Sequence, residues 1–410
     1  MGQRMSVLRV INETATTPRT VENIGLSRAP ATTSTVHARR AEINAFPGVV
    51  QLSRRARGAL HTLLAIVCVC TGAGCSSVAY YGQAVSGQMA LLVNRRDLAE
   101  VIADDSTDRE VRAKLRHVER VLGFAAAAGL PVGGSYGAYV DLERPYVVWN
   151  VYAAPEFSLA PHTFCYLVVG CLAYKGFFAE EDARALAATL EAEGFDTWVG
   201  GVAAYSTLGW FDDPILSSFV VRSDGRLAAL LFHELAHKVV FIKGDTAFNE
   251  GFATAVELIL LQRWLDARGA GAEFDEHVAS SARRQAFTAL VLEERKRLEA
   301  LYATGRAPAA MREAKADIIE ALRERYRSLA AGWPVSPYSG WIEGPINNAK
   351  LANVATYHAH VPAFRALYTQ AGSIGAFFDE VRALSKLDSA PRAAKLQELA
   401  DLADAQETSR

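Results

Sequence analysis

The chain has 410 residues, of which 50% are hydrophobic and 21% are charged, and its 43 Lys and Arg nearly balance its 45 Asp and Glu. This composition excludes an intrinsically disordered chain, a collagen-like or coiled-coil rod and a small disulfide-rich protein. The formal net charge of -2 gives no overall electrostatic reason to bind nucleic acid or an anionic membrane. Any partner therefore has to be inferred from a local site.

The first 75 residues do not have the pattern of a folded domain. Residues 1–50 show neither the period of a strand nor that of a helix, and we predict that they are unstructured or precede the true start of translation. Three arginines at 54–57 are followed by an apolar stretch at 59–69 and by small residues at 71–74. This order is typical of a secretory signal, because a membrane-spanning helix needs about 20 apolar residues. We predict a signal peptide over residues 51–75.

Cys75 directly follows the small residues and resembles the lipidated cysteine of the lipobox of bacterial lipoproteins. The resemblance implies a lipid anchor on Cys75 in the bacterial membrane and a place on the periplasmic side of the cell envelope. An ordinary secretory signal and a buried apolar segment are the alternatives. In an oxidising compartment Cys165 and Cys171 can close a small disulfide loop, and two buried free thiols are the alternative there.

From residue 76 to 410 the pattern predicts an α+β domain. Apolar residues at helical spacing predict an N-terminal helical block at 78–130. Residues 135–225 are rich in Tyr, Val, Phe and Trp, with Gly and Pro between them, and predict a mostly antiparallel strand region with one helix at about 179–193. From about residue 226 onward the pattern is helical again.

The sequence HELAH lies in this last block, within an uninterrupted helical pattern at 226–243 for which Asp224 is the expected N-cap. His233 and His237 are four residues apart, so both imidazoles project from one side of a helix and can bind one zinc ion at about 2.0–2.1 Å each. Glu234 is then placed to act on a water molecule bound to that ion. The alternative is that the three side chains share an amphipathic helix by coincidence.

A catalytic zinc ion of this class has a third protein ligand and leaves its fourth position to water. Gly244 and Asp245 interrupt the first helix, and a second helix is predicted at 246–267. So short a turn packs the two helices side by side and brings the start of the second towards the end of the first. We therefore predict Glu250 as the third ligand.

HELAH followed by NEGFA at 249–253 resembles the gluzincin metallopeptidases, whose zinc ligands are the two histidines and the Glu of an N-E-x-x-A segment. The resemblance implies a zincin-like helical block in which His233, His237 and Glu250 bind zinc and Glu234 is the general base. A longer resemblance is carried by YYGQAVSGQ at 80–88, RPYVVWNV at 144–151, AAPEFS at 153–158 and YSTLGWFDDP at 205–214. In these segments the chain resembles a bacterial group named putative aminopeptidases, often lipoproteins, and the resemblance implies a peptide substrate.

The oxyanion formed during peptide hydrolysis needs a hydrogen-bond donor. Gluzincins generally supply a downstream Tyr or His, and the resemblance implies Tyr357 first, with His358 and His360 as further candidates. All three lie at the end of residues 346–360, which have the pattern of an apolar-faced helix. A packed and hydrogen-bonded core tyrosine is the alternative at Tyr357.

An aminopeptidase also needs a carboxylate for the free amine of its substrate. Glu156, Asp212 and Asp213 are the candidates, although Asp212 and Asp213 precede a proline and can equally form a turn. The strand-like residues 205–210 could pair with an extended peptide as an added edge strand.

The sequence therefore predicts a zinc-dependent peptide hydrolase, an aminopeptidase, with one zinc ion and no nucleic-acid partner. A zinc endopeptidase is one alternative. The other is a non-catalytic envelope lipoprotein whose zinc site is structural.

Overall fold

The computed structural model describes residues 80–166, 170–204, 212–354 and 360–408. The described residues fall into two units, residues 80–86 in one and residues from 87 onward in the other. Residues 80–86 are helical. The predicted signal peptide and Cys75 lie outside the described residues. None of the helices described is long and apolar enough to cross a membrane.

The N-terminal helical block contains α2 (Leu98–Ala103) and α3 (Arg109–Ala127). Each begins at an aspartate, because Asp97 and Asp108 accept hydrogen bonds from backbone N–H groups of the first turn and so satisfy donors that the helix leaves unpaired. One face of α3 is apolar and buried, and α3 packs on α6 (Asp224–Val239).

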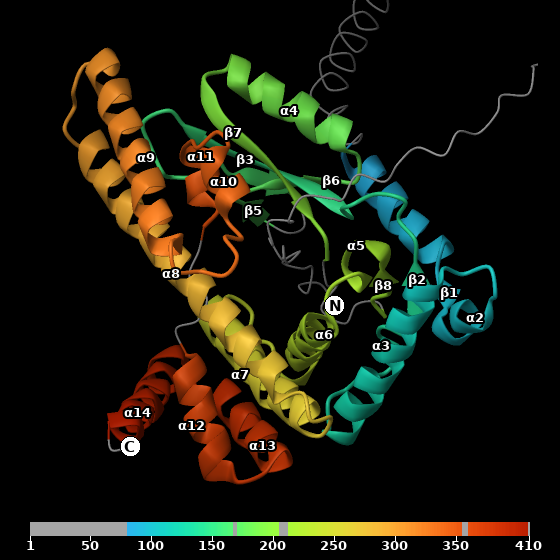
Figure 1. Ribbon diagram of the computed structural model, residues 1–410. Coiled ribbons are helices and arrows are strands. Elements are labelled where there is room, and N and C mark those ends of the chain that lie inside the picture. Colours follow the sequence, from blue (N-terminus) through green and yellow to red (C-terminus); the bar gives the residue numbers. More distant parts are fainter. Residues whose placement is uncertain (1–79, 167–169, 205–211, 355–359, 409–410) are drawn as a thin grey trace, which may run out of the picture. The chain divides into compact units, whose positions relative to one another are not determined.

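Small sheets follow, so the chain is a mixed α+β protein. The described strands are β1 (Arg96–Asp97), β2 (Ala138–Val140), β3 (Val148–Pro155), β4 (Phe164–Tyr166), β5 (Gly170–Leu172), β6 (Lys175–Phe177), β7 (Phe195–Val202) and β8 (Ile215–Leu216). They pair in the orders β1-β2-β8, β6-β3-β7 and β4-β5. The pairing is antiparallel except between β2 and β8, which run parallel. The helix α4 (Glu180–Ala192) packs along β3 and β7, and Gly194, with φ of +90°, follows its end (Figure 1).

Every described element after Leu216 is helical. These are α5 (Ser217–Val220), α6, α7 (Thr246–Asp266), α8 (Gly271–Tyr302), α9 (Pro308–Ala330), α10 (Ser339–Glu343), α11 (Asn348–Ala352), α12 (Val361–Ala371), α13 (Ile374–Ser385) and α14 (Ser389–Thr408). The helices α6 and α7 lie side by side, with α3 against α6, and α8 and α12 against α7 (Figure 1). The main hydrophobic core lies among these helices, and a second core lies between α8, α9 and α10.

Two predicted helices differ from those observed. α6 ends at Val239, four residues before the predicted end, and Asp224 is its first helical residue, with Ser223 at the N-cap. The Asp224 carboxylate accepts a hydrogen bond from Lys114 Nζ at 2.8 Å, which is a partner that local sequence does not reveal. In the range 346–360, which is predicted as a helix, the described helix α11 ends at Ala352, and Asn353 and Val354 are not helical. The next helix, α12, begins at Val361 beside a proline that favours a helix start.

Candidate metal centre

The two histidines of HELAH lie on the buried side of α6. His233 and His237 are both buried, and their ring centroids are 5.1 Å apart with an angle of 79° between the ring planes. Residues four apart on a helix lie on the same face, one turn above the other. The helix thus presents two imidazole nitrogens to the same region of the interior.

The third side chain is held in place by the turn between α6 and α7. Asp245 caps α7 by accepting a hydrogen bond from the backbone N–H of Phe248 at 3.1 Å. The side chain of Asn249 makes two bonds of 2.8 Å to the backbone of Ile242, donating to its carbonyl and accepting from its N–H. Because Glu250 directly follows Asn249, these bonds fix the part of α7 that carries the Glu250 carboxylate.

The three side chains converge. His233 Nε2 lies 3.6 Å from Glu250 Oε2, and His237 Nε2 lies 3.8 Å from Glu250 Oε1. One ligand atom of each residue can be chosen so that all lie within 4.8 Å of one another, and all three residues are buried. A tetrahedral zinc site places neighbouring ligand atoms about 3.4 Å apart, so the donor set and its spacing fit a metal ion of this kind.

Glu234 is buried beside this group, and neither of its carboxylate oxygens accepts a hydrogen bond from a residue that the structure describes. A buried carboxylate without a donor is costly, because it loses its hydration without compensation. A water molecule bound to a metal ion is a donor that such a carboxylate can use. The buried position of Glu234 therefore also fits a metal centre.

A further carboxylate, which the sequence analysis does not identify, orients one of the histidines. Glu257 Oε2 lies 2.9 Å from His233 Nδ1, and Glu257 Oε1 lies 3.0 Å from Nε2 of His277 on α8. Burial raises the pKa of Glu257, but the hydrogen bonds and charges of the two histidines outweigh it and the net pKa is lowered. Glu257 is therefore ionised. With Nδ1–H of His233 donating to Glu257, the Nε2 lone pair of His233 is left for a metal ion.

A sequence signal for Glu257 does exist. It lies seven residues after Glu250 on α7, which is two turns further along the same face. His277, in contrast, comes from the next helix and has no fixed spacing to the motif.

Glu156, a predicted substrate-binding residue, is held by an ion pair at the end of β3. Its two carboxylate oxygens accept hydrogen bonds from Arg312 Nε at 2.5 Å and Arg312 Nη2 at 2.8 Å, which lower the pKa of Glu156. Its backbone carbonyl accepts hydrogen bonds from Lys315 Nζ and Asn348 Nδ2, at 2.9 and 2.8 Å. Glu156 thus belongs to a polar cluster that joins β3 to α9 and α11.

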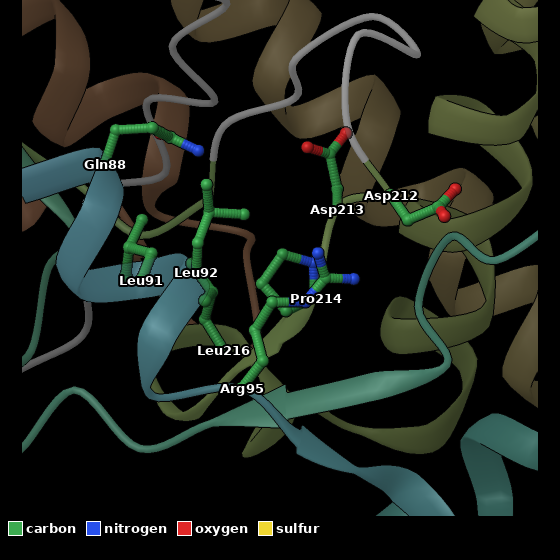
Figure 2. A pocket seen from close by; sticks show the side chains of 8 residues that line it. All are labelled: Gln88, Leu91, Leu92, Arg95, Asp212, Asp213, Pro214 and Leu216. Carbon is green, nitrogen blue, oxygen red and sulfur yellow. The ribbon is translucent and has the colours of Figure 1, made fainter. Parts of the chain in front are cut away.

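Asp212 and Asp213 line a small pocket of about 10 Å³, which has room for about one water molecule. The pocket is also lined by Gln88, Leu91, Leu92, Arg95, Pro214 and Leu216, and the carboxylates of the two aspartates point in different directions (Figure 2). Asp212 is exposed and Asp213 is buried. A Cβ atom on Gly134 would overlap the Asp212 carboxylate, so this side chain packs on the loop that contains Gly134.

Several predicted residues fall outside the described part of the chain. These are Tyr357, His358 and the strand-like residues 205–210. His360 is described and lies at the N-cap of α12. A Cβ atom on Gly251 would be 2.9 Å from His360 Cβ, so the glycine next to Glu250 allows the start of α12 to approach α7 closely. Burial lowers the pKa of His360.

Cys165 and Cys171 face each other across the β4–β5 pair and are joined by a disulfide bond. The bond closes the short loop between two strands of three residues each. Strands this short make few hydrogen bonds with each other. The disulfide stabilises their pairing because it restricts the unfolded chain.

A family model with the description "Putative aminopeptidase" matches residues 79–396. No curated protein and no solved structure matches the chain.

Proposed function

The chain belongs to the family described as "Putative aminopeptidase", and on that premise we propose that it is a zinc-dependent peptide hydrolase that removes residues from the free N-terminus of peptides. The observation that carries this proposal is the convergence of His233, His237 and Glu250 next to the buried carboxylate of Glu234. Two imidazoles and a carboxylate are the donor set of many catalytic zinc sites.

Each residue of the site has a separate role in this proposal. His233, His237 and Glu250 would hold the ion, and Glu257 keeps His233 in the tautomer that leaves its Nε2 lone pair available. A bound zinc ion would supply a water molecule with a pKa near 7 and polarise the peptide carbonyl. Glu234 accepts the proton of the attacking water and then donates it to the nitrogen of the leaving amine.

The number of ligand residues in the group of His233, His237 and Glu250 favours a catalytic zinc site over a structural one. Structural zinc sites have four protein ligands, whereas the group found among the described residues has three. A structural site also gives no reason to bury the Glu234 carboxylate without a hydrogen-bond donor from the described residues.

We test the function by measuring metal content and peptide cleavage in the purified protein. We expect about one zinc ion per chain, loss of cleavage on chelation and recovery when zinc is added back. Glu234→Gln should keep the metal and lose about 10²–10⁴-fold in kcat, since it removes the general base, while Glu250→Ala should lose the metal. Undiminished turnover by Glu234→Gln would disprove the mechanism.

Substrates with free and with N-acetylated termini distinguish the two kinds of peptidase. An aminopeptidase cleaves only peptides with a free amine and releases single residues. Equal cleavage of both substrates would show that the protein is an endopeptidase.

We also propose that the protein is exported and anchored in the bacterial membrane through a lipid on Cys75. The apolar stretch and small residues before Cys75 support this, and the disulfide between Cys165 and Cys171 suits an oxidising compartment. Labelled fatty acid should be incorporated into the wild-type protein in cells and not into Cys75→Ser. Equal labelling of both proteins would contradict the anchor.

A further inference from the structure

The loop between α3 and β2 adopts an uncommon backbone conformation. It contains Gly133 with φ of +56° and Tyr136 with φ of +64°. Glycine adopts positive φ freely, but a bulky side chain there costs of order 1 kcal/mol. A strained residue of this kind persists only when the surrounding structure holds it, and such residues cluster at functional sites.

Two other parts of the chain hold this loop. Lys238 Nζ, on α6, donates hydrogen bonds to the carbonyl of Val132 at 3.1 Å and to Ser135 Oγ at 2.8 Å. The backbone N–H of Tyr136 donates to the carbonyl of Asp213 at 2.6 Å. The loop is therefore held just before Tyr136 by α6 and at Tyr136 itself by the segment that leads into β8.

These contacts bring the loop that carries Tyr136 to the face of α6 on which Glu234 lies. Lys238 lies four residues after Glu234 on α6, so the two side chains share one face of the helix. Ser135, which Lys238 binds, directly precedes Tyr136, and Tyr136 is buried. The Tyr136 hydroxyl is close enough to Glu234 to experience the charge of its carboxylate.

The Tyr136 hydroxyl is a neutral donor. Burial raises the pKa of Tyr136 well above its ordinary value of 10, and the carboxylates of Glu234 and Asp213 raise it further. The hydroxyl does not donate to Glu234, because neither Glu234 oxygen accepts a hydrogen bond from a described residue.

We propose that Tyr136 is a catalytic residue whose phenol hydroxyl donates a hydrogen bond to the carbonyl oxygen of the substrate as that oxygen becomes an oxyanion. No proton is transferred in this step. The hydrogen bond stabilises the negative charge on the substrate oxygen until the C–N bond breaks. The proposal rests on the proposed peptidase function and adds a donor from upstream of HELAH to that site. Removing one donor of this kind typically lowers kcat by about 10²–10³-fold.

The test compares Tyr136→Phe with Tyr139→Phe, because both tyrosines are buried and three residues apart. Tyr139 lies on β2, where Asp141 and Ser217 influence its hydroxyl and Glu234 does not. We expect Tyr136→Phe to lose about 10²–10³-fold in kcat, with KM changed less than about threefold, and Tyr139→Phe to stay near the wild-type values.

Two further readouts do not depend on turnover. We expect zinc content and the midpoint of urea unfolding to be equal in the two variants. Affinity for a phosphinic peptide, which mimics the tetrahedral anion, should fall in Tyr136→Phe by about the same factor as kcat/KM.

The possible outcomes separate the role of Tyr136 from the proposed peptidase function. If the wild-type protein cleaves peptides and Tyr136→Phe keeps its kcat within threefold, or loses zinc or stability relative to Tyr139→Phe, Tyr136 is not an oxyanion donor while the peptidase function stands. If the wild-type protein, loaded with zinc, cleaves no peptide, the proposed function fails and the role of Tyr136 fails with it.

Discussion

The Nδ1 atom of His233 lies 2.9 Å from Oε2 of Glu257, and the other oxygen of the same carboxylate lies 3.0 Å from Nε2 of His277. A histidine of HELAH is thereby connected through one carboxylate to a histidine on a third helix. Such outer partners fix the tautomer and the orientation of a metal-binding imidazole. The candidate metal centre therefore extends beyond its three ligand residues.

Glu257→Gln should weaken zinc binding about 10–100-fold, because the neutral amide orients His233 less firmly than a carboxylate does. His277→Ala should have a smaller effect, since it removes a partner of Glu257 and not of the ligand itself. Competition with a chromogenic chelator measures both affinities. Glu299→Gln, an exposed substitution on α8, is the control, and an affinity for Glu257→Gln equal to that of this control would contradict the role of Glu257.

Asn249→Ala should destabilise the protein by about 1–3 kcal/mol, because it leaves the backbone N–H and carbonyl of Ile242 without their side-chain partner. We also expect weaker zinc binding, since the same bonds hold the segment that carries Glu250. Urea unfolding of the metal-free protein measures the change in stability, and zinc titration measures the change in zinc affinity. Substitution of the exposed Asn94 by Ala should change neither.

Glu156→Gln should leave KM for peptides with a free N-terminus unchanged. Its carboxylate already accepts two hydrogen bonds from Arg312, so it is engaged at the β3–α9 contact and is a poor partner for a substrate amine. Steady-state kinetics with one short peptide measure this, and Arg312→Gln provides the matched change on the other side of the pair. A KM that rises at least tenfold only in Glu156→Gln would show that Glu156 binds the amine after all.

The protein should lose stability as the pH falls below about 6.5, and His117 should contribute to the loss. Burial lowers the pKa of His117 below its ordinary value of 6.5, with contributions in the same direction from Arg268 and Arg120, while the Asp224 carboxylate and backbone oppose it. In this range the unfolded chain binds a proton that the folded chain does not, so acid favours unfolding.

The matched variant for this prediction is His117→Gln, whose amide can still donate to the Asp224 carbonyl that His117 Nε2 contacts at 3.0 Å. Between pH 7 and pH 5 the free energy of unfolding should fall less in this variant than in the wild-type protein. Equal falls, measured by urea unfolding at each pH, would show that His117 does not titrate differently in the folded and unfolded chains.

The order and type of the main elements could be predicted from the sequence, because they follow local periodicity. The helix at 179–193 corresponds to α4, and the strand-rich pattern at 135–225 contains β2 to β8. Element ends were harder to predict. α6 ends at Val239, and in the range 346–360 the described helix α11 ends at Ala352, where the carbonyl of Val354 accepts a hydrogen bond from the distant Arg295.

Within the site, local spacing in the sequence predicts the residues that share a helix or a short hairpin. Spacing of four residues puts His233 and His237 on one face of α6, and a tight turn limits where Glu250 can lie. Local spacing does not predict which groups from distant parts of the chain contact these residues. Three contacts depend on how separate elements cross: His277 with Glu257, Lys238 with the Ser135 that precedes Tyr136, and Glu156 with Arg312. The way in which the elements cross is set by the packing of the whole core, and local sequence periodicity does not predict it.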